Sequence, residues 1–96
     1  MATLIKCAEQ DKKNQTIKEI EPENGKTFEL KEMYKLINCS MVEFIYFDNQ
    51  ILIIDEEGKL NHKPINDIAT YLFRKNKKIH DIIVGDVLLV NTNQIK

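Results

Sequence analysis

Apolar and polar residues alternate with a period of two in two short segments near the start of the chain. Residues 3–8 and 16–20 follow this pattern, which is typical of strands with one buried face, and residues 9–14 between them are polar and charged. We therefore expect an antiparallel hairpin. Pro22 and the Asn24–Gly25 pair should end it, because proline lacks a backbone donor and Asn-Gly favours a tight turn.

The apolar spacing then changes to that of a helix over residues 28–37. Thr27 is a suitable N-cap, since its hydroxyl can accept a hydrogen bond from a first-turn amide. Asn38 can end the helix in a left-handed conformation. The apolar stripe recurs at i, i+3, i+4 and i+7 and consists of Leu30, Met33, Tyr34 and Ile37.

Aromatic and branched residues dominate the middle of the chain. Residues 41–47 and 51–54 are predicted strands, and Asp48–Asn49 can form the two-residue turn between them. The second of these strands is apolar on both faces, which indicates a central position in the sheet. We expect a core hairpin over residues 41–55, followed by a turn at Glu57–Gly58.

The last third predicts a helix and a strand. Asn66 is a good N-cap for a helix over residues 67–74, and the basic residues Arg74–Lys78 suit the negative end of its dipole. Residues 84–90 form the predicted last strand, in which Gly85 indicates a bulge or a close backbone approach. Residues 91–96 are expected to form a frayed end.

These elements give the order β-β-α-β-β-α-β. The sequence therefore predicts an α+β fold, a small single domain over residues 1–96 with two helices and a mostly antiparallel sheet. The length matches one domain of common size.

Charge and hydropathy narrow the function classes. The chain has 14 Lys and Arg against 15 Asp and Glu, so its net charge of -1 argues against a dedicated double-stranded DNA binder. Nucleic acid is an unlikely partner, although weak binding through the cations of residues 74–78 stays open. No apolar run approaches the roughly 20 residues that cross a bilayer. The first residues lack a long apolar segment, so we expect no membrane partner and a location in the host cytosol.

Catalytic and metal-binding patterns are weak. Cys7 and Cys39 are far apart, and we expect both to be free. His62 and His80 are solitary, so the sequence predicts no metal site and no cofactor. No nucleophile motif or Gly-rich phosphate loop occurs in the sequence, so we expect that the protein is not an enzyme.

A set of short motifs resembles a phage and mobile-element domain family of unknown function. The match covers roughly residues 15–91, with the motifs in the expected order. Where the family often has paired glycines after the first helix, this chain has Cys39–Ser40, which leaves the geometry of that turn open. The residues that carry the resemblance are Leu36, Ile37, Val42, Glu43, Asp55 to Leu60, Pro64, Asn66, Ala69, Thr70 and Ile83 to Val87.

The resemblance implies a gene of phage or prophage origin. Small phage proteins often act on host defence, and some, such as the Sequestin and Lockin families, sequester nucleotide immune signals. By analogy, we expect an anti-defence protein that binds a cyclic ADP-ribose isomer, histidine-ADP-ribose or a cyclic oligonucleotide without cleaving it. A homo-oligomer is expected, because so small a chain rarely encloses a nucleotide alone. The alternative is a protein–protein inhibitor or adaptor that acts on a host factor.

The second predicted helix suggests where a phosphate would bind. Asn66 and Thr70 lie four residues apart at its N-terminus, where free amides and the helix dipole favour anions, and Arg74 continues the same face. Each of the three also has a simpler structural role, as a helix cap, a packing residue and a solvated helix end.

Four further residues complete the candidate ligand site. Tyr46 and Tyr71 could stack on an adenine, and Glu56 and Asp86 could accept hydrogen bonds from ribose hydroxyls or a base amine. The alternative roles are a core position for Tyr46, which is more common for an aromatic residue in an apolar strand, and an ordinary hairpin turn for Glu56.

Overall fold

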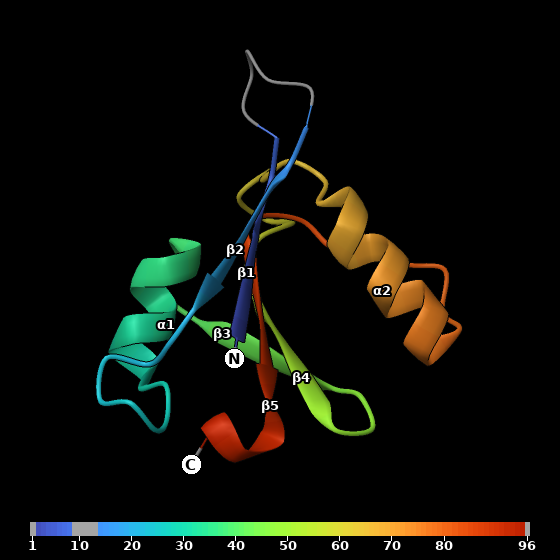
Figure 1. Cartoon of the computed structure of the whole chain (residues 1–96). Helices are drawn as coiled ribbons and strands as arrows, with labels where there is room; N and C mark the ends of the chain where they lie inside the picture. The colour runs from blue at the N-terminus through green and yellow to red at the C-terminus, as the bar shows by residue number, and fades with distance from the viewer. Residues whose placement is uncertain (1, 9–13, 96) are drawn as a thin grey trace.

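A five-stranded antiparallel sheet separates two helices (Figure 1). The computed structural model describes residues 2–8 and 14–95, so most of the turn predicted at residues 9–14 lies outside the described residues. The α+β class and the order of the elements are confirmed, and the strands lie in the order β2-β1-β5-β4-β3. The elements are β1 (Ala2–Lys6), β2 (Thr16–Ile20), α1 (Leu30–Ile37), β3 (Val42–Tyr46), β4 (Gln50–Asp55), α2 (Asp67–Lys77), β5 (Val87–Asn91) and a 3-10 helix, η1 (Thr92–Gln94).

The central strands of the sheet are buried on both faces, whereas the edge strand β2 is exposed. Met33 and Ile37 of α1 belong to the core cluster on one face, and Ala69 of α2 belongs to the cluster on the other. Strand β4 lies between β3 and β5, as its apolar run predicted. Its residues alternate between the two clusters, with Ile53 on the α1 side and Leu52 on the α2 side. Both predicted hairpins, β1–β2 and β3–β4, are present.

Helix α1 begins later than the sequence indicated, and Thr27 is not its N-cap. The helix starts at Leu30, after Glu29, whose side chain makes no cap hydrogen bond. The Thr27 amide instead donates to Asn24 Oδ1 at 2.9 Å, because an asparagine side chain readily bonds backbone amides in a turn. Asn38 does end the helix in the left-handed region, at φ 53°.

Helix α2 and strand β5 also have shifted ends. The basic residues extend α2 to Lys77, three residues beyond the predicted end, and Lys78 adopts the left-handed cap conformation. Strand β5 starts at Val87 instead of residue 84, because Gly85 turns the chain at φ 79°. A Cβ on Gly85 would lie 2.8 Å from Cδ of the Lys63 side chain, but the positive φ is what favours glycine at this position.

The C-terminal segment is not frayed up to Ile95. Asn91 and Gln94 form a reciprocal capping box around η1, and the Gln94 side chain is buried. The Phe28 amide donates to the Gln94 carbonyl at 2.8 Å. This long-range bond ties the segment before α1 to the end of the chain, which local composition does not reveal.

A buried ion pair organises the acidic turn after β4. Asp55 is 5 % exposed, and its Oδ2 lies 2.7 Å from Lys63 Nζ. The same ammonium donates to the carbonyls of Ile37, at 3.3 Å, and Asn38, at 2.6 Å. Asp55 Oδ1 accepts from the Glu57 amide at 2.9 Å. Lys63 therefore joins the end of β4 to the negative end of α1.

Candidate functional site

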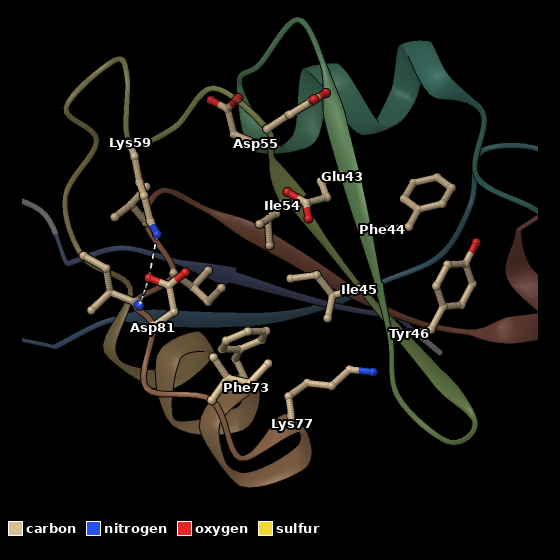
Figure 2. Close-up of a pocket in the computed structure, with 15 residues that line it drawn as sticks. Glu43, Phe44, Ile45, Tyr46, Ile54, Asp55, Lys59, Phe73, Lys77 and Asp81 are labelled. Carbon is tan, nitrogen blue, oxygen red and sulfur yellow. Dashed lines mark hydrogen bonds and ion pairs between the residues drawn. The ribbon is translucent and has the colours of Figure 1, made fainter.

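A cavity lies between the edge of the sheet and α2 (Figure 2). We call it the β3–α2 groove. Its volume is about 490 Å³, and the wall comes from β3, the end of β4, the turn after it, the second half of α2 and the segment before β5. The lining residues are Glu43, Phe44, Ile45, Tyr46, Ile54, Asp55, Glu56, Lys59, Phe73, Lys77, Ile79, Asp81, Ile82, Ile83 and Val84.

The inner wall of the groove is apolar. Ile45 and Ile54 pack against the core cluster on the α2 side, as does Phe73 from α2. Side chains alternate along a strand, so Glu43 shares the face of Ile45 and points into the same space. Figure 2 shows Glu43, Ile45 and Ile54 on the side of β3 that faces α2, with Phe73 of α2 across the groove from Ile45. An apolar wall with a carboxylate inside it suits a ligand that has both a ring and polar groups.

A salt bridge spans one side of the groove. Lys59 Nζ, on the turn after β4, lies 2.6 Å from Asp81 Oδ1, on the segment before β5 (Figure 2). The Ile82 amide donates to the same oxygen at 2.8 Å. These two contacts, chiefly the Lys59 hydrogen bond, lower the pKa of Asp81 from its ordinary value.

We expect this salt bridge to withstand moderate acid. A lowered pKa in the folded state means that the stabilisation by Asp81 is complete above the ordinary carboxyl pKa, and is lost only as the pH falls through the lower folded value. Substitution Lys59→Gln should raise the Asp81 pKa toward its ordinary value, as carboxyl-carbon NMR titration would measure. The control is Lys26→Gln, on the turn before α1. An unchanged pKa in Lys59→Gln would show that the salt bridge does not form in solution.

Three charged side chains of the lining remain available to a ligand. Within the described residues, no hydrogen bond or ion pair involves the carboxylates of Glu43 and Glu56 or the ammonium of Lys77. The other charged lining residues are paired, Lys59 with Asp81 and Asp55 with Lys63. The groove thus offers acceptors on the sheet side and a cation on the α2 side.

Of the residues predicted from sequence, Tyr46 and Glu56 line this groove. Glu56 is exposed on the turn after β4. The Tyr46 ring packs edge-on against Phe44, with centroids 6.5 Å apart, and Figure 2 shows both rings on the opposite side of β3 from Ile45. Tyr46 therefore contributes to the rim and does not face the apolar wall.

Asn66 is fully buried and fully hydrogen-bonded. Its Oδ1 accepts from the Ala69 amide at 3.0 Å, which confirms the N-cap, and from Gln15 Nε2 at 2.6 Å. Its Nδ2 donates to the carbonyls of Ile5, at 3.0 Å, and Gly85, at 2.9 Å. This side chain connects α2 to β1 and to the entry of β5, and no polar atom of it is left for a ligand.

The phosphate site expected at the N-terminus of α2 is occupied by the chain itself. The Ile68 amide donates to Gln15 Oε1 at 2.9 Å, and the Ala69 amide to Asn66. The Thr70 hydroxyl donates to the Ile83 carbonyl at 3.2 Å and accepts from the Ile83 amide at 2.9 Å. Because these groups have internal partners, we do not place a ligand there.

The remaining predicted residues do not line the groove. Arg74 Nε donates to the Asp81 carbonyl at 3.0 Å and so holds the segment before β5 against α2. Tyr71 is 63 % exposed, outside the groove, with Lys75 Nζ 5.9 Å from its ring centroid. Asp86 accepts from the Cys7 amide at 2.8 Å, beside a separate cavity of about 180 Å³.

Sequence reasoning missed the residues that form the centre of the groove. Glu43 carried a usable signal, since it is the one charged residue in an otherwise apolar and aromatic strand. Phe73 and Lys77 gave no signal of their own, since an apolar residue within a helix and a basic residue near a helix end are both ordinary. Their proximity to Glu43 depends on how α2 crosses the sheet, which local patterns do not contain.

The described part of the chain contains neither a metal-ligand cluster nor a helix that could span a membrane. Within residues 2–8 and 14–95, no group of three His, Cys, Asp or Glu side chains is placed to share a metal ion. None of the helices in this part of the chain has the length and apolar character that a membrane crossing requires.

The sequence model of a family described as a domain of unknown function, DUF3846, matches residues 4–95, which is nearly the whole chain. No curated protein and no solved structure matches the chain.

Proposed function

The chain belongs to the DUF3846 family, and from the β3–α2 groove we propose that it binds a nucleotide-type small molecule and holds it without cleaving it. The observation that carries the proposal is one open cavity that combines an apolar wall with charges of both signs, for which the described residues provide no partner. In the phage setting implied by the sequence resemblance, the bound molecule would be an immune signal of the host, and capture would lower its free concentration.

The size and wall of the groove support this proposal. Binding sites for small molecules commonly have volumes of about 300–1,000 Å³, apolar walls and a few well-placed polar groups. The groove, at about 490 Å³, falls in this range. Phe73 offers an aromatic surface, and Ile45 and Ile54 lie across from it, so a flat base can lie between α2 and the sheet.

The charges suggest how the ligand would be oriented. Carboxylates accept hydrogen bonds, so Glu43 and Glu56 suit ribose hydroxyls or the amine of a base. Lys77 would meet a phosphate from the α2 side. We therefore place the phosphate of the ligand beside the second half of α2. At the N-terminus of this helix, the amides already bond Gln15 and Asn66.

We expect a cognate ligand to raise the melting temperature of the purified protein. A ligand at about 100 times its Kd adds about 2.7 kcal/mol to the free energy of unfolding, which for a domain of this size raises Tm by roughly 10–20 °C. The panel includes cyclic ADP-ribose isomers, histidine-ADP-ribose and cyclic dinucleotides. The variants Glu43→Gln and Lys77→Met should reduce the rise in Tm, and the controls Glu19→Gln on β2 and Lys31→Met on α1 should not.

The fate of the ligand separates capture from catalysis. After heat release, chromatography should recover the ligand unchanged and in stoichiometric amount. A consumed ligand would contradict capture and indicate an enzyme.

A flat response across the panel would favour the alternative, a protein–protein inhibitor or adaptor. Tyr71, 63 % exposed on the outer face of α2, is the observation that favours this alternative. It predicts a stable complex with a host protein that the variant Tyr71→Ala weakens.

A further inference from the structure

Strand β3 ends the sheet with an open edge. The strand order finishes at β3, which pairs with β4 in the described chain. The Phe47 amide donates to the Gln50 carbonyl, and the Glu56 amide to the Met41 carbonyl, so the odd-numbered residues of this strand direct their backbone groups toward β4. The amides and carbonyls of the even-numbered residues, Val42, Phe44 and Tyr46, therefore point outward.

The two edges of the sheet differ in their protection. Strand β2, at the other edge, carries Lys18 and Glu19 and is followed closely by Pro22, features that discourage pairing with a further strand. Strand β3 carries Glu43 as its one charge. The side chains of Met41, at its start, and Tyr46, at its end, are 50 % and 56 % exposed. The β3 edge is thus the one suited to association.

Strand β3 has a central residue about which it can pair with a second copy of itself without bringing like charges together. Phe44 is central, with Val42 and Tyr46 two residues away on one face and Glu43 and Ile45 next to it on the other. We propose that β3 pairs antiparallel with β3 of a second copy, with Phe44 opposite Phe44 of the second copy. This register bonds every outward-facing amide and carbonyl of the strand, because the hydrogen-bonded positions of an antiparallel pair recur at every second residue.

The register also suits the side chains. On the α1 side, Val42 lies opposite Tyr46 of the second copy, so the row across the interface is apolar and aromatic throughout. On the α2 side, Glu43 lies opposite Ile45 of the second copy, and the two Glu43 carboxylates are not directly opposed. Like charges directly opposite would destabilise the pair, and this register avoids them. A self-complementary strand favours a second copy over an unrelated peptide.

The pairing would place the two β3–α2 grooves on one face of a continuous sheet. Opposite residues of an antiparallel pair point to the same face, so both α2 helices lie on the same side. Each groove is lined by β3, and the two would therefore meet across the shared edge. The pairing does not rest on the proposed function, because its test measures mass and cross-linking and requires no ligand.

The first test is the molecular mass in solution. Light scattering after size-exclusion chromatography should give twice the 11.2 kDa of the chain for the native protein at micromolar concentration. The variant Tyr46→Pro removes an outward-facing amide and leaves the bonds to β4 intact, so it should be monomeric and folded. The control Tyr46→Ala keeps the amide. It should still dimerise, with a larger dissociation constant than the native protein. A monomeric native protein, or a dimeric and folded Tyr46→Pro, would overturn the proposal.

Cross-linking tests the register and does not depend on the proline variant. Opposed residues at a non-hydrogen-bonded position have Cα atoms about 4.5 Å apart, which a disulfide can bridge. A mixture of the single variants Glu43→Cys and Ile45→Cys should therefore form a disulfide-linked dimer on mild oxidation, whereas either variant alone should form much less. Equal cross-linking in all three samples, or none in the mixture, contradicts this register.

The native thiols give a low background in that experiment. Burial, followed by the nearby Asp86 carboxylate, raises the pKa of Cys7 to about 11, and burial likewise raises the pKa of Cys39. Because of the raised pKa values, few thiolates form at a pH near 8, and both native cysteines react slowly. The native protein, oxidised in parallel, measures what background remains.

Discussion

Substitution Lys63→Met is expected to lower the free energy of unfolding by about 3–5 kcal/mol, because it leaves a buried carboxylate without its partner. Asp55 Oδ2 lies 2.7 Å from the Lys63 ammonium, and no hydrogen bond satisfies this oxygen within the described residues. The carbonyls of Ile37 and Asn38 lose a donor as well. Such a loss is a large fraction of the roughly 5–15 kcal/mol by which domains are stable. Urea unfolding followed by circular dichroism measures it.

The exposed ion pair at the groove supplies a matched control. Lys59 and Asp81 lie 2.6 Å apart, but their side chains are 54 % and 52 % exposed, so water and salt screen the attraction. Lys59→Met should therefore change the stability far less than Lys63→Met. The double variant Asp55→Leu with Lys63→Met should recover part of the loss, since neither charge remains buried. Similar losses from Lys59→Met and Lys63→Met would contradict this account of Asp55.

Substitution Asn66→Asp is expected to destabilise the protein by roughly 2–6 kcal/mol, although aspartate is as good a helix cap as asparagine. The loss of stability comes from the side-chain NH2 group of Asn66, which aspartate lacks. Nδ2 donates to the buried carbonyls of Ile5 and Gly85, and each carbonyl left without a donor costs about 1–3 kcal/mol. Thermal unfolding measures the effect, and Asn61→Asp, at an exposed turn position, is the control.

The same variant distinguishes a structural role from a ligand contact. If Asn66 is structural, Asn66→Asp lowers the stability and any ligand still adds its usual increment to the Tm of the folded variant. A variant as stable as the native protein that has lost ligand binding would contradict the structural role and restore the original expectation for this residue.

The local pattern was sufficient for the order of the elements. Alternation of period two placed β1 and β2, the apolar run of residues 51–54 placed β4 in the centre of the sheet, and Asn66 and Asn38 marked helix ends correctly. Each of these signals acts through a residue's immediate neighbours. Some boundaries were wrong. Thr27 belongs to a turn in which the nearby Asn24 side chain bonds its amide, and the C-terminal segment depends on a distant partner, because a bond between Phe28 and Gln94 holds it.

The candidate site was less accessible to sequence reasoning for a related reason. Asn66, Thr70 and Asp86 are polar residues in an apolar setting, which a ligand site and a buried hydrogen-bond network produce equally. The structure shows that their polar atoms bond the chain's own backbone, at Gly85, Ile83 and Cys7 among others. Burial and bonding partners separate the two cases, and neither is encoded in local spacing.

The sequence by itself determined the fold class, the order of the elements and two helix caps, Asn38 at the end of α1 and Asn66 at the start of α2. These follow from backbone propensity and apolar periodicity, which act over a few residues. The tertiary structure alone decided which charges are buried in pairs and which have no partner among residues 2–8 and 14–95. The Lys63 ammonium contacts Asp55 and the carbonyls at the end of α1. In contrast, Glu43, Glu56 and Lys77 line the β3–α2 groove. The free energy of a charge depends on its solvent exposure and its partners in space, and these are set only when α2 packs on the sheet.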